Sequence, residues 1–229
     1  MDFSITVFRT VRITENLHFY ITETLLVTWI IMALFIALAV VVRIKSKKWQ
    51  ALSKPSGLQN VMEFLVTSFE NIFKGSAGDK VLYLAPWFFT LFAFLVVSNT
   101  IGITGLRPPT ADWSMTFPLA ISSFMLIQYA GLKHRPKNFL KGFVQPIFLF
   151  LPLNLMGELS KPIAMSFRLF GNVLGGMILM SLLYGMAPFI LTLGVPAVLH
   201  AYFDVAVGIL QAFIFLVLSI TFVGLAAEG

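Results

Sequence analysis

Four ionisable side chains lie inside the two longest apolar segments of the chain. Glu158, Lys161 and Arg168 belong to the first segment and Asp204 belongs to the second. Such groups cost about 2.5 to 3.5 kcal/mol each on insertion into a bilayer, and they usually mark a path for ions or substrates. An arginine stays protonated in almost any environment, so Arg168 is expected to be a fixed positive charge and not a proton carrier. The alternative is a structural arginine paired with a carboxylate between helices.

Helical spacing places two polar amides beside these charges. Asn172 follows Arg168 by four residues and Gln211 follows Asp204 by seven, so each pair lies along one stripe of its helix. If the two segments form an antiparallel hairpin that turns near residue 189 or 190, equal path lengths put Arg168 level with Gln211.

The composition indicates that lipid is the solvent of this chain. Of its 229 residues 58% are hydrophobic and only 11% are charged, and the mean hydropathy is +0.90. A soluble domain carries about 25% charged residues. We therefore predict an all-α polytopic membrane protein with about five crossings. Cysteine is absent from the sequence, which excludes disulfides and cysteine-ligated metals.

We expect a single membrane domain over residues 1–229. Its predicted parts are an outer N-terminal segment at 1–20, a first span at 21–44, an amphipathic interfacial helix at 58–75, spans at 81–103 and 117–132, and a long helix hairpin at 143–184 and 196–227. The two long helices would measure roughly 60 and 50 Å against a hydrocarbon core of about 30 Å. They must therefore tilt strongly, bend or extend beyond the bilayer, and Pro152 and Pro162 could supply bends.

The basic residues predict the orientation. The loops after the first and third spans hold nine Lys or Arg, whereas the loops at the other face hold Arg107 and none near residues 185–195. By the positive-inside rule the basic loops are cytoplasmic, which puts the N-terminus outside and Glu228 inside a bacterial-type inner (cell) membrane. This pattern explains the net charge of +6 better than binding to nucleic acid, which we do not expect.

Three motifs occur in a defined order. They are Ser98-Asn99 followed by PTAD at 109–112, then ELSKP at 158–162 with SFRLFGN at 166–172, and finally GILQAFIF at 208–215. Together they resemble subunit a of the F-type ATP synthases, over about Pro55 to the C-terminus.

The resemblance implies a stator that catalyses nothing alone. In that family a ring of small c-type hairpin subunits, each with a buried carboxylate, turns against the tilted helix pair, and b-type subunits form the peripheral stalk. Arg168 would face the passing carboxylate, favour its ionised form and prevent leakage between two offset half-channels. The translocated ion would be a proton or possibly sodium, and no cofactor is expected.

The resemblance also implies roles for the remaining polar residues. Asn172 and Gln211 would line the path beside the arginine, and Asp204 would be a relay carboxylate of the outer half-channel. Asp112 and Asn99 would lie near the mouth of that half-channel, and Glu158 would serve the cytoplasmic side. The alternative for each of these residues is an ordinary hydrogen bond between helices.

The chain departs from the family pattern at two positions. Many members have Glu where Met177 stands, and some have His where Asp204 stands. The outer relay therefore depends on Asp204, other polar groups and water. His200 lies one turn before Asp204 and could contribute, although a histidine near the membrane interface is more often structural.

Two other functions fit the sequence less well. A secondary transporter with an intramembrane site around Arg168 and Asp204 would predict repeat symmetry or paired broken helices, and the sequence shows no internal repeat. An intramembrane hydrolase is disfavoured because the Gly-x-Ser-x-Gly and His-Glu-x-x-His motifs are both absent from the sequence.

Overall fold

The computed structural model describes residues 7–14, 17–47, 57–145, 147–186 and 195–228. It begins with an antiparallel β-hairpin formed by β1 (Val7–Thr14) and β2 (Leu17–Thr22). The sequence did not predict these strands within the segment at 1–20. The hairpin leads directly into the first long helix, α1 (Glu23–Ser46).

Within the described ranges, five helical segments are long and apolar enough to cross a membrane. They are α1, Asp79–Thr104, Trp113–His134, Phe148–Gly185 and Val198–Glu228. The predicted fold class, an all-α polytopic protein with about five crossings, is confirmed. That the whole chain forms one membrane domain stays a prediction.

The spans after α1 are built from α-helices and short 3₁₀ turns. Helix α2 (Gly57–Ala77) covers the predicted amphipathic segment. The second span contains α3 (Ala85–Thr100) between two short 3₁₀ turns, Asp79–Leu84 and Ile101–Thr104. A further 3₁₀ turn, Pro109–Ala111, precedes α4 (Trp113–His134), and α5 (Pro136–Val144) follows it.

A single long helix was predicted over residues 143–184. The structure instead has a break near the start of this segment. Helix α5 ends at Val144, and a 3₁₀ turn at Phe148–Phe150 precedes α6 (Leu151–Met186). Pro152 is the second residue of α6, where its missing N–H costs no hydrogen bond, so it starts the helix instead of bending it. Asn154 helps to close the turn by donating to the backbone oxygens of Phe143 and Gln145, each at 3.0 Å.

The last segment also differs from a uniform α-helix. It comprises α8 (Val195–His200), a π-helical stretch at Ala201–Val207, and α9 (Gly208–Glu228). Wide turns of this kind are rare and occur frequently at functional sites.

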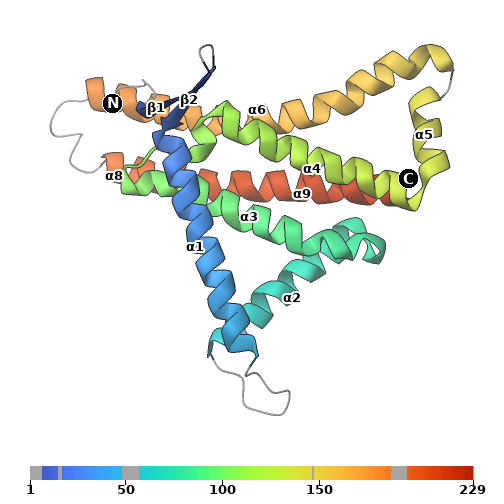
Figure 1. Ribbon diagram of the computed structural model, residues 1–229, viewed down its shortest axis with the longest axis horizontal. Coiled ribbons are helices and arrows are strands. Elements are labelled where there is room, and N and C mark those ends of the chain that lie inside the picture. The colour runs from blue at the N-terminus through green and yellow to red at the C-terminus, as the bar shows by residue number, and fades with distance from the viewer. Residues whose placement is uncertain (1–6, 15–16, 48–56, 146, 187–194, 229) are drawn as a thin grey trace.

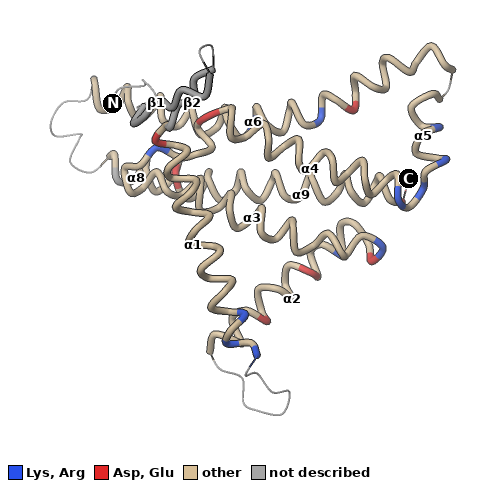
Figure 2. Tube along the Cα trace, viewed as in Figure 1, with Lys and Arg blue, Asp and Glu red and all other residues tan. Residues whose placement is uncertain are grey.

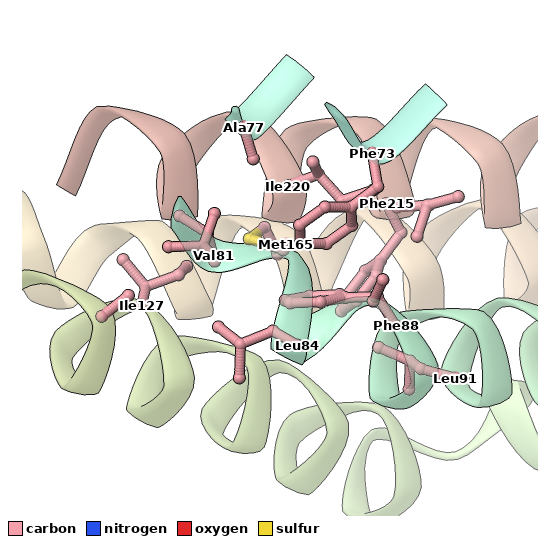
Figure 3. Packing of buried hydrophobic residues seen from close by; sticks show 14 of the residues in the cluster. Phe73, Ala77, Val81, Leu84, Phe88, Leu91, Ile127, Met165, Phe215 and Ile220 are labelled. Atoms are coloured by element: carbon pink, nitrogen blue, oxygen red, sulfur yellow. The ribbon is translucent and has the colours of Figure 1, made fainter. Parts of the chain in front are cut away.

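Helix α9 is the centre of the packing. It contacts α2, α3, α4 and α6, and its buried residues Phe215 and Ile220 join a cluster that includes Phe73 and Phe88 (Figure 3). Gly224 permits a close approach to α2, because a Cβ atom at this position would lie 2.8 Å from the Cα atom of Ala77.

The relative directions of the helices support the predicted tilt. Helices α4, α6 and α9 lie side by side, and α1 runs across their direction (Figure 1). Helices that cross in this way cannot all follow the membrane normal. The 36 residues of α6 extend over about 54 Å, well beyond a hydrocarbon core of about 30 Å, so strong tilt is the expected solution for this group.

Candidate ion-translocation site

Arg168 lies on an exposed face of α6. Its neighbours Met165, Ser166 and Leu169 are buried, whereas Arg168 and Asn172 are exposed. The hydroxyl groups of Ser166 and of Thr116 on α4 are 3.2 Å apart, which fixes the buried side of α6. Among the residues that the structure describes, no carboxylate forms a salt bridge with Arg168.

Asn172 connects this face of α6 to α9. Its Nδ2 donates to Oε1 of Gln211 at 2.5 Å. Gln211 is buried, and its Nε2 finds no acceptor among the described residues. Equal path lengths put Gln211 level with Arg168, whereas Gln211 bonds to Asn172, one turn of α6 further along the chain.

Asp204 lies in the π-helical stretch and faces the second span. Its carboxylate accepts a hydrogen bond from Nδ1 of His200 at 2.6 Å. A Cβ atom at Gly102 would lie 3.0 Å from the Asp204 carboxyl carbon, so glycine leaves the room that the carboxylate occupies.

A small cavity joins four of the predicted site residues. Its volume is about 10 Å³, close to the minimum for one water molecule, and Asp204, Asn99, Asn172 and Gln211 are among its lining residues. The unpaired Nε2 of Gln211 and the Asp204 carboxylate are polar partners of the kind that a water molecule needs. This cavity is therefore suited to connecting the acid with the amide pair.

Asn99 is a hydrogen-bonding junction as well as a lining residue. Its Nδ2 donates to the backbone oxygen of Gly208 at 2.8 Å, and its Oδ1 accepts from the hydroxyl of Thr110 at 2.7 Å. Gly208 is the first residue after the π-helical stretch. Asn99 therefore holds that stretch against α3.

Asp112 is placed apart from this cavity. Its Oδ1 accepts from Nη2 of Arg107 at 2.9 Å, and its Oδ2 accepts from the hydroxyl of Thr24 at 2.6 Å. The ion pair is largely buried, with side-chain exposures of 14% for Arg107 and 10% for Asp112. Both oxygens are engaged, and they join α1 to the loop before α4.

Glu158 belongs to a second, larger cavity. It forms a salt bridge with Lys161, and its Oε2 accepts from Nε2 of Gln128 on α4 at 3.2 Å. The cavity has a volume of about 660 Å³ and is lined by residues of α4, α5, α6 and α9, Arg135 among them. It shares no residue with the small cavity around Asp204, and Arg168 lies between the two groups of residues along α6.

The sequence was compared with known proteins. The model of the ATP synthase A chain family matches residues 25–224. The chain belongs to this family. It is 33% identical to ATP synthase subunit a of Trichlorobacter lovleyi over 86% of this chain and 83% of the relative. It is also 33% identical to ATP synthase subunit a of Moorella thermoacetica over 91% of this chain and 92% of the relative. It is 36% identical to ATP synthase subunit a of Acidothermus cellulolyticus over 78% of this chain and 69% of the relative.

Membership makes the chain a non-catalytic membrane subunit of an ATP synthase, which confirms the prediction that it is no enzyme alone. It also means that the chain works in a complex with other subunits. The alternative of an independent secondary transporter gains no support from these relatives.

Two polar residues that contact the predicted site residues were not among them. Gln128 on α4 donates a hydrogen bond to Glu158. In the sequence, the feature that could have identified it is a polar amide within an apolar span. His200 is the residue that could contribute to the relay, although such histidines are more often structural. In the structure it lies between Asp204 and Tyr184 of α6, whose hydroxyl is 3.1 Å from its Nε2.

Proposed function

We propose that the chain is the ion-translocating stator of a rotary F-type ATP synthase, with two offset half-channels and Arg168 facing the rotor ring. The observation that carries the proposal is the setting of Arg168. It is exposed on α6, has no carboxylate partner in the described part of the chain, and stands between two separate cavities, each of which has a carboxylate in its wall.

The physical role of Arg168 follows from its permanent charge. A cation beside a carboxylate of the ring favours the ionised form of that carboxylate and lowers its pKa. An incoming ring carboxylate therefore releases its ion before it passes Arg168, and it binds another ion after passing. An ion that approaches Arg168 without a carboxylate is repelled, so transfer between the half-channels requires rotation of the ring.

The two cavities supply the half-channels. On the outer side, Asp204 relays the ion and the amides of Asn172 and Gln211 line its path, with water in the small cavity between them. Asn99 borders that cavity, whereas Asp112 supports the outer side through its bonds to α1 and the loop before α4. On the cytoplasmic side, Glu158 opens onto the larger cavity.

The partners follow from the same arrangement. The exposed face of α6 that holds Arg168 receives the ring of c-type hairpin subunits, and b-type subunits of the peripheral stalk bind elsewhere on the membrane sector. We take the proton as the ion, because Asp204 is hydrogen-bonded to a histidine, which is a proton donor and acceptor.

The basic residues give the orientation in a bacterial cell membrane. Lys and Arg gather at α5 with the adjoining end of α4, and at the end of α1 (Figure 2). Arg135 donates to the backbone oxygen of Glu228, so the C-terminal end of α9 lies at the basic α4–α5 corner. The positive-inside rule makes this end cytoplasmic and puts the N-terminus outside.

The test is Arg168→Ala in the intact ATP synthase, reconstituted in vesicles. We expect ATP synthesis and ATP-driven proton pumping to fall by about 100-fold or more, because the charge that controls the ring carboxylate is lost. Arg43→Ala removes the same charge from the exposed end of α1 and should leave both rates unchanged. Full synthesis by Arg168→Ala would refute the proposal. Assays with and without sodium distinguish the two ions.

A further inference from the structure

A threonine hydroxyl is enclosed in the turn that precedes α4. Thr110 is the central residue of the 3₁₀ turn Pro109–Ala111, all three residues of which are buried, and Thr110 itself is 0% exposed. The turn contacts α1, α3, α4 and α6. Its hydroxyl lies 2.7 Å from Oδ1 of Asn99 on α3. The packing of four helices is therefore connected, through one hydroxyl, to the Asn99 side chain.

The two partners of Asn99 determine which way its amide points. A backbone oxygen only accepts hydrogen bonds, so the amide atom that lies 2.8 Å from the oxygen of Gly208 must be Nδ2. Oδ1 then faces Thr110, whose hydroxyl must be the donor. Asn99 is 2% exposed, so bulk water cannot replace either partner. Without the Thr110 hydroxyl, Oδ1 would lose its donor and Nδ2 would lose the bond that keeps it aimed at Gly208.

The orientation of Asn99 affects the small cavity beside Asp204. Asn99, Asp204 and Gly208 all belong to the wall of this cavity, whose volume is about 10 Å³. A cavity of this size holds at most about one water molecule. A Cβ atom at Gly208 would lie 3.0 Å from the Asn99 Cβ, so α3 and the end of the π-helical stretch are already in close contact. A small displacement of Asn99 would therefore change both the cavity and the segment that carries Asp204.

We propose that Thr110 is a positioning residue of the outer half-channel, which rests on the function proposed above. Its hydroxyl orients the amide of Asn99. Asn99 in turn holds the π-helical stretch at Gly208 and keeps the cavity beside Asp204 open to a water molecule. Thr110 neither touches the ion nor exchanges a proton, so its effect on transport is transmitted entirely through Asn99.

Two substitutions separate the hydroxyl of Thr110 from its shape. Thr110→Val keeps the branched shape and removes the hydroxyl, whereas Thr110→Ser keeps the hydroxyl and removes the methyl group. In ATP-driven proton pumping by the intact synthase in vesicles, the valine variant should lose at least about 10-fold and the serine variant should stay within about 2-fold of wild type, because small misplacements of transport groups are costly. Wild-type pumping by Thr110→Val, or an equal loss in both variants, would overturn the proposal.

A double substitution tests whether Thr110 acts through Asn99. Asn99→Ala removes the group that Thr110 is proposed to orient. Adding Thr110→Val to Asn99→Ala should then leave the pumping rate of Asn99→Ala unchanged, because residues that act through one another are not additive. A further loss of about 10-fold in the double variant would show that the two residues act independently, and would overturn the proposed route.

A nearby threonine supplies the matched control. The hydroxyl of Thr100 bonds to the backbone oxygens of Val96 and Val97 in its own helix, so Thr100→Val should pump normally. Co-purification of the ring verifies that each variant assembles. If Thr110→Val does not assemble, Thr110→Ala is compared with Thr110→Ser, because these two differ only in the hydroxyl, and equal pumping rates would overturn the proposal.

The stator function is tested separately by Arg168→Ala in the same vesicles. Loss of pumping in Arg168→Ala together with wild-type pumping in Thr110→Val would overturn the positioning role and leave the stator function standing. Wild-type pumping by Arg168→Ala would refute the stator function itself.

Discussion

Arg168 and Asp204 illustrate how neighbours decide what a charged residue does. Arg168 lies on the exposed face of α6, because Met165, Ser166 and Leu169 are buried on the opposite side of the helix. Asp204 is half-buried, and Gly102 leaves the space for its carboxylate. Arg168 has no carboxylate partner among the described residues, whereas Asp204 is hydrogen-bonded to His200 and Asp112 is paired with Arg107. At the scale of single residues, the surroundings of Arg168 and Asp204 are therefore consistent with the roles proposed for them.

The residue scale predicts the effect of Asp204→Asn. The amide keeps the size of the side chain but cannot accept a proton, so ion flow should slow by about 10- to 100-fold while the synthase still assembles. Proton uptake by inverted vesicles measures this. Asp79→Asn at the exposed turn after α2 is the matched control and should have no effect. Unchanged flow in Asp204→Asn at every pH would remove this residue from the relay.

At the scale of elements, close contacts between helices hold α9 in register with its neighbours. Helix α9 reaches α2 at Gly224, where backbone atoms would meet any added side chain. Asn99 fixes the junction between the π-helical stretch and α9 through Gly208. These contacts position Gln211 opposite Asn172, so the register of the hairpin is a result of packing.

The element scale predicts the cost of Gly224→Ala. The new Cβ would lie 2.8 Å from the Ala77 Cα and 2.9 Å from the Ser76 oxygen, and such backbone atoms yield poorly. We expect a loss of about 1 to 3 kcal/mol in stability, measured as a lower melting temperature of the purified complex. Gly75→Ala on α2 meets no atom within 4 Å and should be neutral or slightly stabilising. Equal melting temperatures for the two variants would contradict the tight contact.

At the scale of the whole molecule, α1 runs across the packed group of α3, α4, α6 and α9, and its second half leads away from that group (Figure 1). Its buried residues Thr24, Val27, Thr28 and Ile31 all lie in its first half. Thr24 joins the Arg107–Asp112 pair there. Lipid is therefore expected to surround the second half of α1.

This arrangement predicts the effect of Asp112→Asn. The substitution removes one charge from a buried hydrogen-bonded pair and should destabilise the docking of α1 by about 1.5 to 3 kcal/mol. Faster hydrogen exchange in the first half of α1 would report the change. Asp79→Asn again serves as the control, because its exposed pair with Lys74 contributes only about 0 to 1 kcal/mol. Equal exchange in both variants would show that Asp112 does not anchor α1.

Local properties of the chain were readable without the structure. Hydropathy predicted the five apolar helices, and helical spacing placed Arg168 and Asn172 on one face. The same spacing put His200 one turn from Asp204, and the two side chains are hydrogen-bonded in the structure. These features depend on residues within a few turns of each other, so composition and period alone determine them.

Contacts between distant segments were decided only by the tertiary structure. The pairing of Asn172 with Gln211, the approach of Tyr184 to His200 and the partners of Asp112 all depend on how whole helices pack. So do the π-helical stretch at Ala201–Val207 and the break before α6. A change of two or three residues in helix register would alter each of these contacts while leaving the hydrophobic pattern intact. Sequence periodicity therefore determined which faces carry polar groups, and packing determined which of those groups meet.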